Sequence, residues 1–194
     1  THGTGLARIT ELVEIQTELP IDIVVCQALP KSPERLEQVL QHGTELGAAA
    51  FLVFAGDRSV AKLETPDKVN KRLERWNSII RSSAEQSGRA VLPPISWHPN
   101  LKAVIQTVQL PLLVLHEEAD TPLRSVVKSV ISSSRGLALI VGPEGGLSPA
   151  EVTTCRNNAG TAISLGPRIL RTETAALAAI AQLSYALENE NDNH

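Results

Sequence analysis

Two glycine-bearing segments near the carboxyl end of the chain combine residue types suited to holding a nucleotide and removing a proton. They are Gly142-Pro-Glu-Gly-Gly146 and Leu165-Gly-Pro-Arg-Ile-Leu-Arg-Thr-Glu-Thr174. Glycine lets backbone groups approach a ligand closely. A guanidinium such as Arg171 can stabilise a developing anion, and a carboxylate such as Glu173 can accept a proton. Each segment follows a short apolar run, so we expect both at the carboxyl ends of parallel strands, where ligands bind.

The two segments match neither of the common nucleotide fingerprints. Gly-x-Gly-x-x-Gly is absent, and no Gly-Lys-Ser/Thr follows the first segment, which argues against a dinucleotide fold and a phosphate-binding loop. A tight turn that only needs glycine remains an alternative for the first segment. For Glu173 the alternative is a stabilising place at a helix start. Arg168 and Arg171 are harder to explain as structural residues, because both lie in a loop at the expected ligand edge.

Elsewhere, short apolar runs alternate with amphipathic stretches, which predicts an α/β fold with a parallel sheet flanked by helices. Strands are expected at residues 21–29, 48–54, 90–95, 112–116, 137–141 and 162–165. Helices are expected from 33 to about 46, and at 66–87, 101–108, from 122, from 149 and at 175–187. Ser148-Pro149 with Glu151 is typical of a capped helix start.

The two ends of the chain do not fit this alternation. Residues 1–19 are interpreted as the remnant of a separate β-rich element, with a strand at Leu6–Ile15. Residues 188–194 are acidic and polar, and are expected to form a flexible tail. The remaining segment, 20–187, is long enough for one well-buried α/β domain.

Composition narrows the function classes. Aromatic residues make up 3% of the chain, which argues against RNA binding through stacked aromatic platforms. The net charge of −3 requires any nucleic-acid contact to come from a local patch. No apolar window has the roughly 20 residues that span a bilayer. Cys26 and Cys155 have no metal-like spacing and are expected to be buried free thiols. A cytoplasmic protein without a membrane segment or a metal is therefore predicted.

The motifs and their order resemble the 16S rRNA uridine-N3 methyltransferase family of the SPOUT superfamily. The resemblance rests on Gly142-Pro-Glu-Gly-Gly-Leu-Ser148 with Glu151, and on Leu165-Gly-Pro-Arg-Ile-Leu-Arg-Thr-Glu-Thr-Ala175. Thr44-Glu-Leu-Gly47, Arg58-Ser59, Glu85-Gln-Ser-Gly-Arg89 and Pro93 also fall in the family's order, so that about residues 21–187 are covered. One departure is His42, where the family usually has lysine.

This resemblance implies a sheet whose carboxyl-terminal segment forms a deep trefoil knot, and a homodimer in which the knots meet. Residues 1–19 would be the remnant of a PUA-like RNA-binding β-barrel. S-adenosylmethionine would bind in the knot. Its contacts would come from one strand end and the two loops, namely Leu115, His116, Gly142, Glu144, Gly146, Leu165, Gly166, Ile169, Leu170 and Thr172. For His116, a strand-end histidine satisfied by backbone hydrogen bonds is the alternative.

The implied reaction is methylation of N3 of one uridine in 16S rRNA of the small ribosomal subunit. N3 must lose its proton before it can attack a methyl group, so the uracil anion needs stabilisation. We hypothesise that Arg171 stabilises this anion and that Glu173 orients Arg171 or accepts the proton, with Glu144 as the reserve base. Arg58, Arg89 and Arg168 are predicted RNA contacts.

Two alternatives stay open. One is a SPOUT methyltransferase that acts on a ribose or on tRNA. The other, from a different class, is a non-catalytic RNA-binding factor in ribosome assembly.

Overall fold

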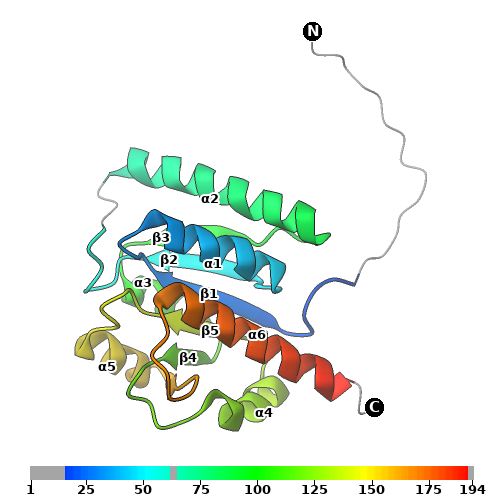
Figure 1. Ribbon diagram of the computed structural model, residues 1–194. Coiled ribbons are helices and arrows are strands. Elements are labelled where there is room, and N and C mark those ends of the chain that lie inside the picture. Colours follow the sequence, from blue (N-terminus) through cyan, green and yellow to red (C-terminus); the bar gives the residue numbers. More distant parts are fainter. Residues whose placement is uncertain (1–15, 62–64, 192–194) are drawn as a thin grey trace, which may run out of the picture.

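The computed structural model describes residues 16–61 and 65–191. A six-stranded parallel sheet runs through the molecule in the order β3-β2-β1-β5-β4-β6 (Figure 1). Its strands are β1 (Asp22–Ala28), β2 (Ala50–Phe54), β3 (Ile95–His98), β4 (Leu112–Leu115), β5 (Gly136–Val141) and β6 (Thr161–Ile163). The predicted parallel α/β fold is confirmed.

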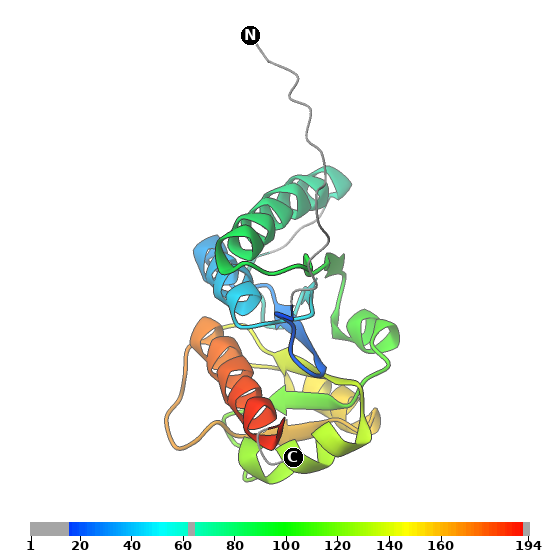
Figure 2. The same ribbon diagram turned by 90° about the vertical axis from the view of Figure 1, so that its right-hand side faces the viewer.

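Helices cover both faces of the sheet, which makes three layers (Figures 1 and 2). One face carries α1 (Pro33–Glu45), α2 (Pro66–Ser87), α4 (Leu123–Ser133) and α6 (Thr172–Asn191). The other face carries α3 (Leu101–Thr107) and α5 (Pro149–Asn157). Strands buried on both faces read as continuous apolar runs, which is why they are visible in the sequence.

Strand β1 shows how the sheet is anchored in two apolar cores. Ile23 and Val25 pack under the α1 and α6 layer, and Cys26 and Ala28 belong to the core on the opposite face. All four side chains are fully buried. The alternation follows from the two-residue period of a strand, and it places Gln27 on the α1 and α6 side.

The structure corrects the third strand, which was expected at 90–95 and lies at Ile95–His98. Pro93 and Pro94 cannot donate a hydrogen bond to a neighbouring strand, so the ladder starts after them. The carbonyl of Pro94 still accepts a hydrogen bond of 2.9 Å from the amide of Phe51. Regular pairing with β2 then runs from Ile95 to His98.

The last helix also differs from its predicted bounds. α6 begins at Thr172 rather than Ala175, and it continues to Asn191 within the segment 188–194 that was expected to be a tail. The earlier start places Glu173 in the first turn, where a negative charge is favoured. The strand predicted at Leu6–Ile15 lies outside the described residues.

The helix starts differ in whether the serine that precedes the helix caps it. At α5, the Ser148 hydroxyl accepts from the Glu151 amide and the Glu151 carboxylate accepts from the Ser148 amide, which completes the predicted capping box. At α1, Ser32 makes no capping bond, because its hydroxyl donates to the Glu34 carboxylate instead. Glu151 is buried, so its box also fixes the loop before α5.

Cys26 and Cys155 are buried free thiols, as the sequence predicts. Burial raises the pKa of the Cys155 thiol to about 11, and it raises the pKa of Cys26 well above its ordinary value. Because the thiolate is the reactive form, we expect neither cysteine to react with iodoacetamide near neutral pH in the folded protein. Mass spectrometry after alkylation, with and without urea, checks this. Fast labelling of either thiol without urea would contradict it.

Within the described residues, no helix combines the length and the apolar character that crossing a membrane would require.

Candidate functional site

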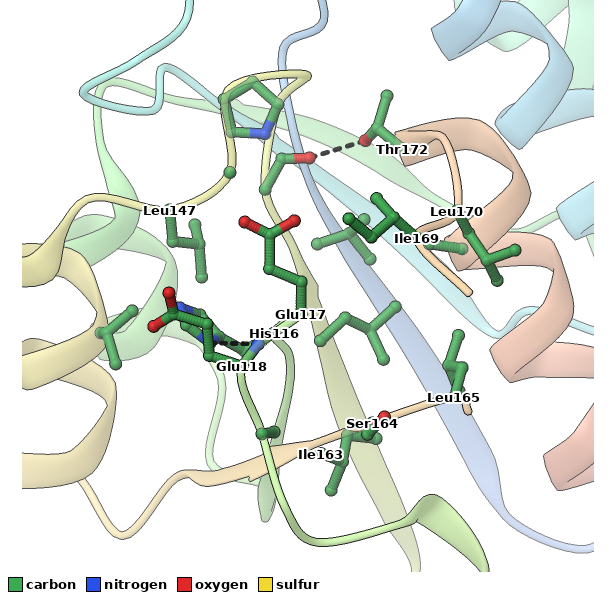
Figure 3. Close-up of a pocket in the computed structure, with 18 of the residues that line it drawn as sticks. His116, Glu117, Glu118, Leu147, Ile163, Ser164, Leu165, Ile169, Leu170 and Thr172 are labelled. Carbon is green, nitrogen blue, oxygen red and sulfur yellow. Dashed lines mark hydrogen bonds between the residues drawn. The ribbon is translucent and has the colours of Figure 1, made fainter. Parts of the chain in front are cut away.

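A pocket of about 1050 Å³ opens at the carboxyl ends of β4, β5 and β6 (Figure 3). It lies beside the point where the sheet order reverses between β1 and β5, the usual ligand position in open α/β sheets. Each residue predicted to hold the cofactor lines this pocket. They are Leu115, His116, Gly142, Glu144, Gly146, Leu165, Gly166, Ile169, Leu170 and Thr172.

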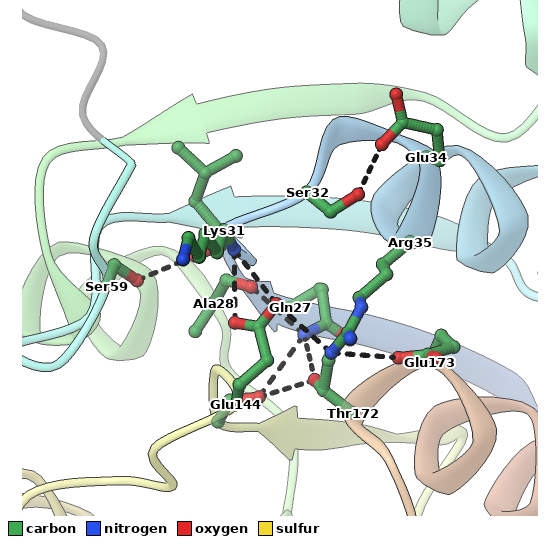
Figure 4. A network of polar contacts seen from close by, with 12 residues as sticks. Gln27, Ala28, Lys31, Ser32, Glu34, Arg35, Ser59, Glu144, Thr172 and Glu173 are labelled. Carbon is green, nitrogen blue, oxygen red and sulfur yellow. Dashed lines mark hydrogen bonds and ion pairs between the residues drawn. The ribbon is translucent and has the colours of Figure 1, made fainter.

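A buried polar network joins the two glycine-bearing loops (Figure 4). The Gln27 amide nitrogen donates to the Thr172 hydroxyl at 2.9 Å and lies 3.4 Å from the Gly142 carbonyl. The Thr172 hydroxyl donates to the same carbonyl at 2.6 Å. Gln27 is 1% exposed, so these bonds form away from water and fix the second loop against the first.

The positions of the two loops that hold glycine require it for different physical reasons. A Cβ on Gly142 would lie 2.8 Å from the Leu147 amide nitrogen, so the tight turn of the first loop leaves no room for a side chain. Gly146 and Gly166 have φ values of 70° and 118°. Residues with a Cβ atom rarely adopt this backbone conformation, whereas glycine does so readily. Apart from Gly166 and its two chain neighbours, no atom of the described residues lies within 4 Å of a Cβ placed on Gly166, so the space beside its backbone is open to a ligand.

His116 directly follows the end of β4 at the pocket wall. Its amide donates to the Ile163 carbonyl at 3.1 Å, and its Nδ1 atom accepts from the Glu118 amide at 3.3 Å. These bonds agree with the alternative reading of a strand-end histidine satisfied by backbone groups. Figure 3 shows Leu165 and Leu170 among the apolar side chains that border the same cavity.

Glu144 is held at the rim of the pocket by α1. Both of its carboxylate oxygens lie 3.0 Å from the Lys31 amide nitrogen, which donates to them. Its Oε1 atom also lies 3.2 Å from the Arg35 guanidinium. Glu144 therefore enters the pocket as a charged group with a fixed orientation.

Glu173 occupies a different environment from the one expected. It is 8% exposed and does not line the pocket. Its nearest cation is Arg35, at 3.9 Å from Oε2, and among the described residues no ion pair within 4.0 Å joins it to Arg171. The α6 start turns the Glu173 carboxylate toward α1, so this arrangement does not support the expectation that Glu173 orients Arg171.

The loop that precedes α6 carries three exposed residues that line the pocket, namely Arg168, Ile169 and Arg171. No hydrogen bond or ion pair joins either arginine side chain to another of the described residues. Arg58 also lines the pocket, and its guanidinium donates to the Gly145 carbonyl at 2.8 Å. Arginines from both loop regions thus lie at the pocket, together with the acidic Glu144 and Glu117.

The loop that carries Arg58 is fastened to the start of α5. The Glu151 carboxylate accepts from the Asp57 amide at 3.1 Å, and the Ser148 hydroxyl donates to the Asp57 carboxylate at 2.5 Å. The Ser59 hydroxyl donates to the Leu29 carbonyl at 2.8 Å. These bonds fix the loop that carries Arg58 against the start of α5 and the end of β1.

Arg89, a predicted RNA contact, is buried and bonded within the protein. Its side chain is 3% exposed. The guanidinium donates to the carbonyls of Thr44 and Ala48, both at 2.9 Å, and pairs with Glu18. Four of the five N–H donors of the guanidinium are thus used within the protein, which disfavours the predicted contact with RNA. His42, at the family's lysine position, pairs with Glu45 at 2.9 Å and does not line the pocket.

Sequence reasoning missed two residues of the site. Gln27 left a signal, since it is the polar exception within an apolar run that becomes a buried strand. Arg35 left none, because a basic residue in the first turn of an amphipathic helix resembles many solvated residues. Only the folded arrangement brings it to Glu144 and Glu173.

The comparisons with known proteins agree with this site. The family profile described as an RNA methyltransferase domain matches residues 17–184. Ribosomal RNA small subunit methyltransferase E of Bacillus subtilis strain 168 is 40% identical over 177 residues, covering 88% of this chain and 68% of that protein. Across this relative and those of the same name from Mycobacterium tuberculosis and Synechocystis, the chain spans 60 to 68% of their length.

Two solved structures with bound S-adenosylmethionine share the fold. A Legionella pneumophila methyltransferase has a TM-score of 0.82 at 34% identity, covering 90% of this chain and 70% of that one. The ribosomal RNA small subunit methyltransferase E of Neisseria gonorrhoeae has a TM-score of 0.78 at 31% identity, covering 88% and 68%. With the profile match over most of its length, the chain belongs to the RNA methyltransferase family.

Proposed function

We propose that this protein uses S-adenosylmethionine to methylate N3 of one uridine in 16S rRNA of the small ribosomal subunit, in the cytoplasm. One observation carries the proposal: a single pocket gathers the two glycine-bearing loops, Arg171 and Glu144. The names of the relatives and the cofactor in two structural neighbours support it.

The pocket residues fit the cofactor. Open backbone at Gly166 and Gly146 and the apolar side chains of Leu115, Leu165 and Leu170 suit an adenosine that is recognised by backbone groups and by apolar contact. The link from Gln27 through Thr172 to Gly142 holds both loops at the spacing the ligand needs. When bound, the cofactor supplies an electrophilic methyl group on a positively charged sulfur.

The protein's own residues would handle the proton and the charge of the uracil. The N3–H bond must break before N3 can form a bond to carbon, and negative charge then spreads to the two carbonyl oxygens. Arg171 is exposed in the pocket without a partner among the described residues, so its donors are available to those oxygens. Glu144 lines the pocket and Glu173 does not, so Glu144 is the proposed acceptor of the proton.

The proposed assembly is a homodimer whose carboxyl-terminal segments form knots that meet at the active sites. The return of Thr172 to bond Gly142 and Gln27 in the middle of the sheet is compatible with the knot and says nothing of the dimer. We propose that Arg58 and Arg168, which both line the pocket, contact the RNA backbone. Segment 20–187 would be the catalytic domain.

The proposal is tested by tritiated methyl transfer to small subunits from cells that lack the activity, followed by mapping of the labelled nucleotide. We expect label on N3 of one uridine in 16S rRNA. Label on a ribose, or in tRNA alone, would contradict the assignment of the site. Cofactor binding without transfer to any RNA would favour the RNA-binding assembly factor.

A further inference from the structure

Arg35 lies in the first turn of α1, with its guanidinium between two carboxylates that come from other segments (Figure 4). Its Nη1 atom is 3.2 Å from Glu144 Oε1 and 3.9 Å from Glu173 Oε2. Glu144 belongs to the loop after β5, and Glu173 to the first turn of α6. One cation therefore connects α1 to the loop after β5 and to the start of α6.

Glu173 depends on this cation. Its side chain is 10% exposed, and its Oε2 atom is buried without a hydrogen-bond partner in the part of the chain that the structure describes. At 3.9 Å the contact with Arg35 is too long for a hydrogen bond, so the attraction between the charges holds the pair. A buried carboxylate that loses its counter-charge is strongly unfavourable, so the start of α6 would have to rearrange without Arg35.

Glu144 is fixed from two sides. The Lys31 amide donates to both of its carboxylate oxygens, and Arg35 approaches Oε1 from α1. The backbone bond fixes where the carboxylate lies, and the guanidinium fixes how it is turned. Lysine at position 35 would keep the charge, but its single compact ammonium lacks the planar set of donors that lets a guanidinium serve two carboxylates.

We propose that Arg35 is a positioning residue for methyl transfer: it uses the buried Glu173 as an anchor and holds Glu144 in the orientation that meets the N3 proton. This inference rests on the proposed function, because it assigns Arg35 a task in that reaction. Arg35 acts through the two carboxylates and not by contact with the RNA.

The first test separates turnover from cofactor binding. Because small misplacements of a catalytic group are costly, Arg35→Gln is expected to lower kcat by about 100-fold. Its Kd for S-adenosylmethionine, measured by calorimetry, is expected to rise far less than kcat falls, by under about tenfold, since the ion pairs of Arg35 are with two carboxylates and not with the glycines of the loops. The kcat of Arg35→Lys should lie between that of Arg35→Gln and that of the unaltered protein. Guanidinium ion at a non-denaturing concentration should partly restore the kcat of Arg35→Ala.

Arg75→Gln is the matched control. Arg75 pairs with Glu37 of α1 at 2.6 and 2.7 Å, but neither residue lines the pocket. This variant also removes a guanidinium–carboxylate pair from α1, and its kcat is expected to match that of the unaltered protein. An equal loss of kcat in both variants would mean that α1 merely needs its ion pairs, and it would overturn the proposal.

A double substitution identifies the path of the effect. If Arg35 acts through Glu144, Arg35→Gln should lower kcat by less than threefold in the Glu144→Gln background. A further loss near 100-fold there would overturn the proposal and point to direct contact with RNA. A kcat of the Arg35→Gln single variant within threefold of that of the unaltered protein would also overturn the proposal. If Arg35→Gln does not fold by circular dichroism, Arg35→Lys carries the same comparisons.

A stability cycle distinguishes failure of this proposal from failure of the proposed function. Urea unfolding of Arg35→Gln, Glu173→Gln and the double variant measures the coupling of the pair without any reference to activity. If the unaltered protein transfers no methyl group, the proposed function fails, whatever the coupling. Absence of coupling between Arg35 and Glu173 would overturn the anchor whether or not methyl transfer occurs.

Discussion

Arg171→Ala is expected to lower methyl transfer to small-subunit RNA by about 100- to 1,000-fold, because it removes the guanidinium available to the uracil anion. The side chain is exposed and makes no ion pair or hydrogen bond within the described residues, so its loss leaves no buried partner behind. Folding and cofactor binding should therefore be unchanged. Single-turnover transfer of tritiated methyl groups measures the rate, and calorimetry measures cofactor binding.

Arg168 provides the control for this loss. It lies in the same loop, is also exposed and also lines the pocket, but it is assigned to the RNA backbone. Arg168→Ala should raise the KM for small subunits in a salt-dependent way and leave the single-turnover rate at saturation near normal. Near-normal turnover of Arg171→Ala, or an equal loss in rate from both variants, would remove the catalytic assignment of Arg171.

Gly142→Ala is expected to weaken cofactor binding by about 10- to 100-fold and to destabilise the fold by about 1–3 kcal/mol. The new Cβ would lie 2.8 Å from the Leu147 amide nitrogen and 3.0 Å from the Gly146 carbonyl carbon. Both are backbone atoms, so the loop itself must move. Its Gly142 carbonyl would then leave Thr172 and Gln27. Calorimetric titration and urea unfolding measure the two effects.

Gly145→Ala is the matched substitution in the same loop. A Cβ there would lie 3.5 Å from the Arg58 Cβ atom, an ordinary contact, and Gly145 does not have a positive φ. Its cofactor affinity and stability should stay close to those of the unaltered protein. Equal weakening by the two alanines would mean that the loop tolerates no side chain anywhere, and that the crowding at Gly142 has no special role.

Features set by local interactions could be predicted from the sequence. α2 runs from Pro66 to Ser87 as expected, because Thr65 caps it and Gly88 ends it with a φ of 70°. The strands β1 and β5 are largely apolar on both faces, so they could be recognised from the sequence as readily as α2. The pocket lining followed from the loops at their ends, since parallel strands bring their carboxyl ends to one edge.

Features set by contacts between distant segments could not be predicted in this way. Arg89 falls in a motif block as an RNA contact would, and only the fold shows carbonyls from the end of α1 around it. Glu173 follows Arg171 closely in sequence, yet the helix start turns its carboxylate to Arg35. Residue types and spacing do not state which way a side chain points once a helix begins.

The bonds from Gln27 also impose an order on the folding of the chain. They reach partners 115 and 145 residues away, on the loop after β5 and at the start of α6. Such distant contacts form slowly, because closing long loops costs entropy before the contact repays it. During synthesis, a chain that has not emerged past Thr172 lacks one wall of the pocket. Cofactor binding therefore reports that β1, β5 and α6 have all reached their final places.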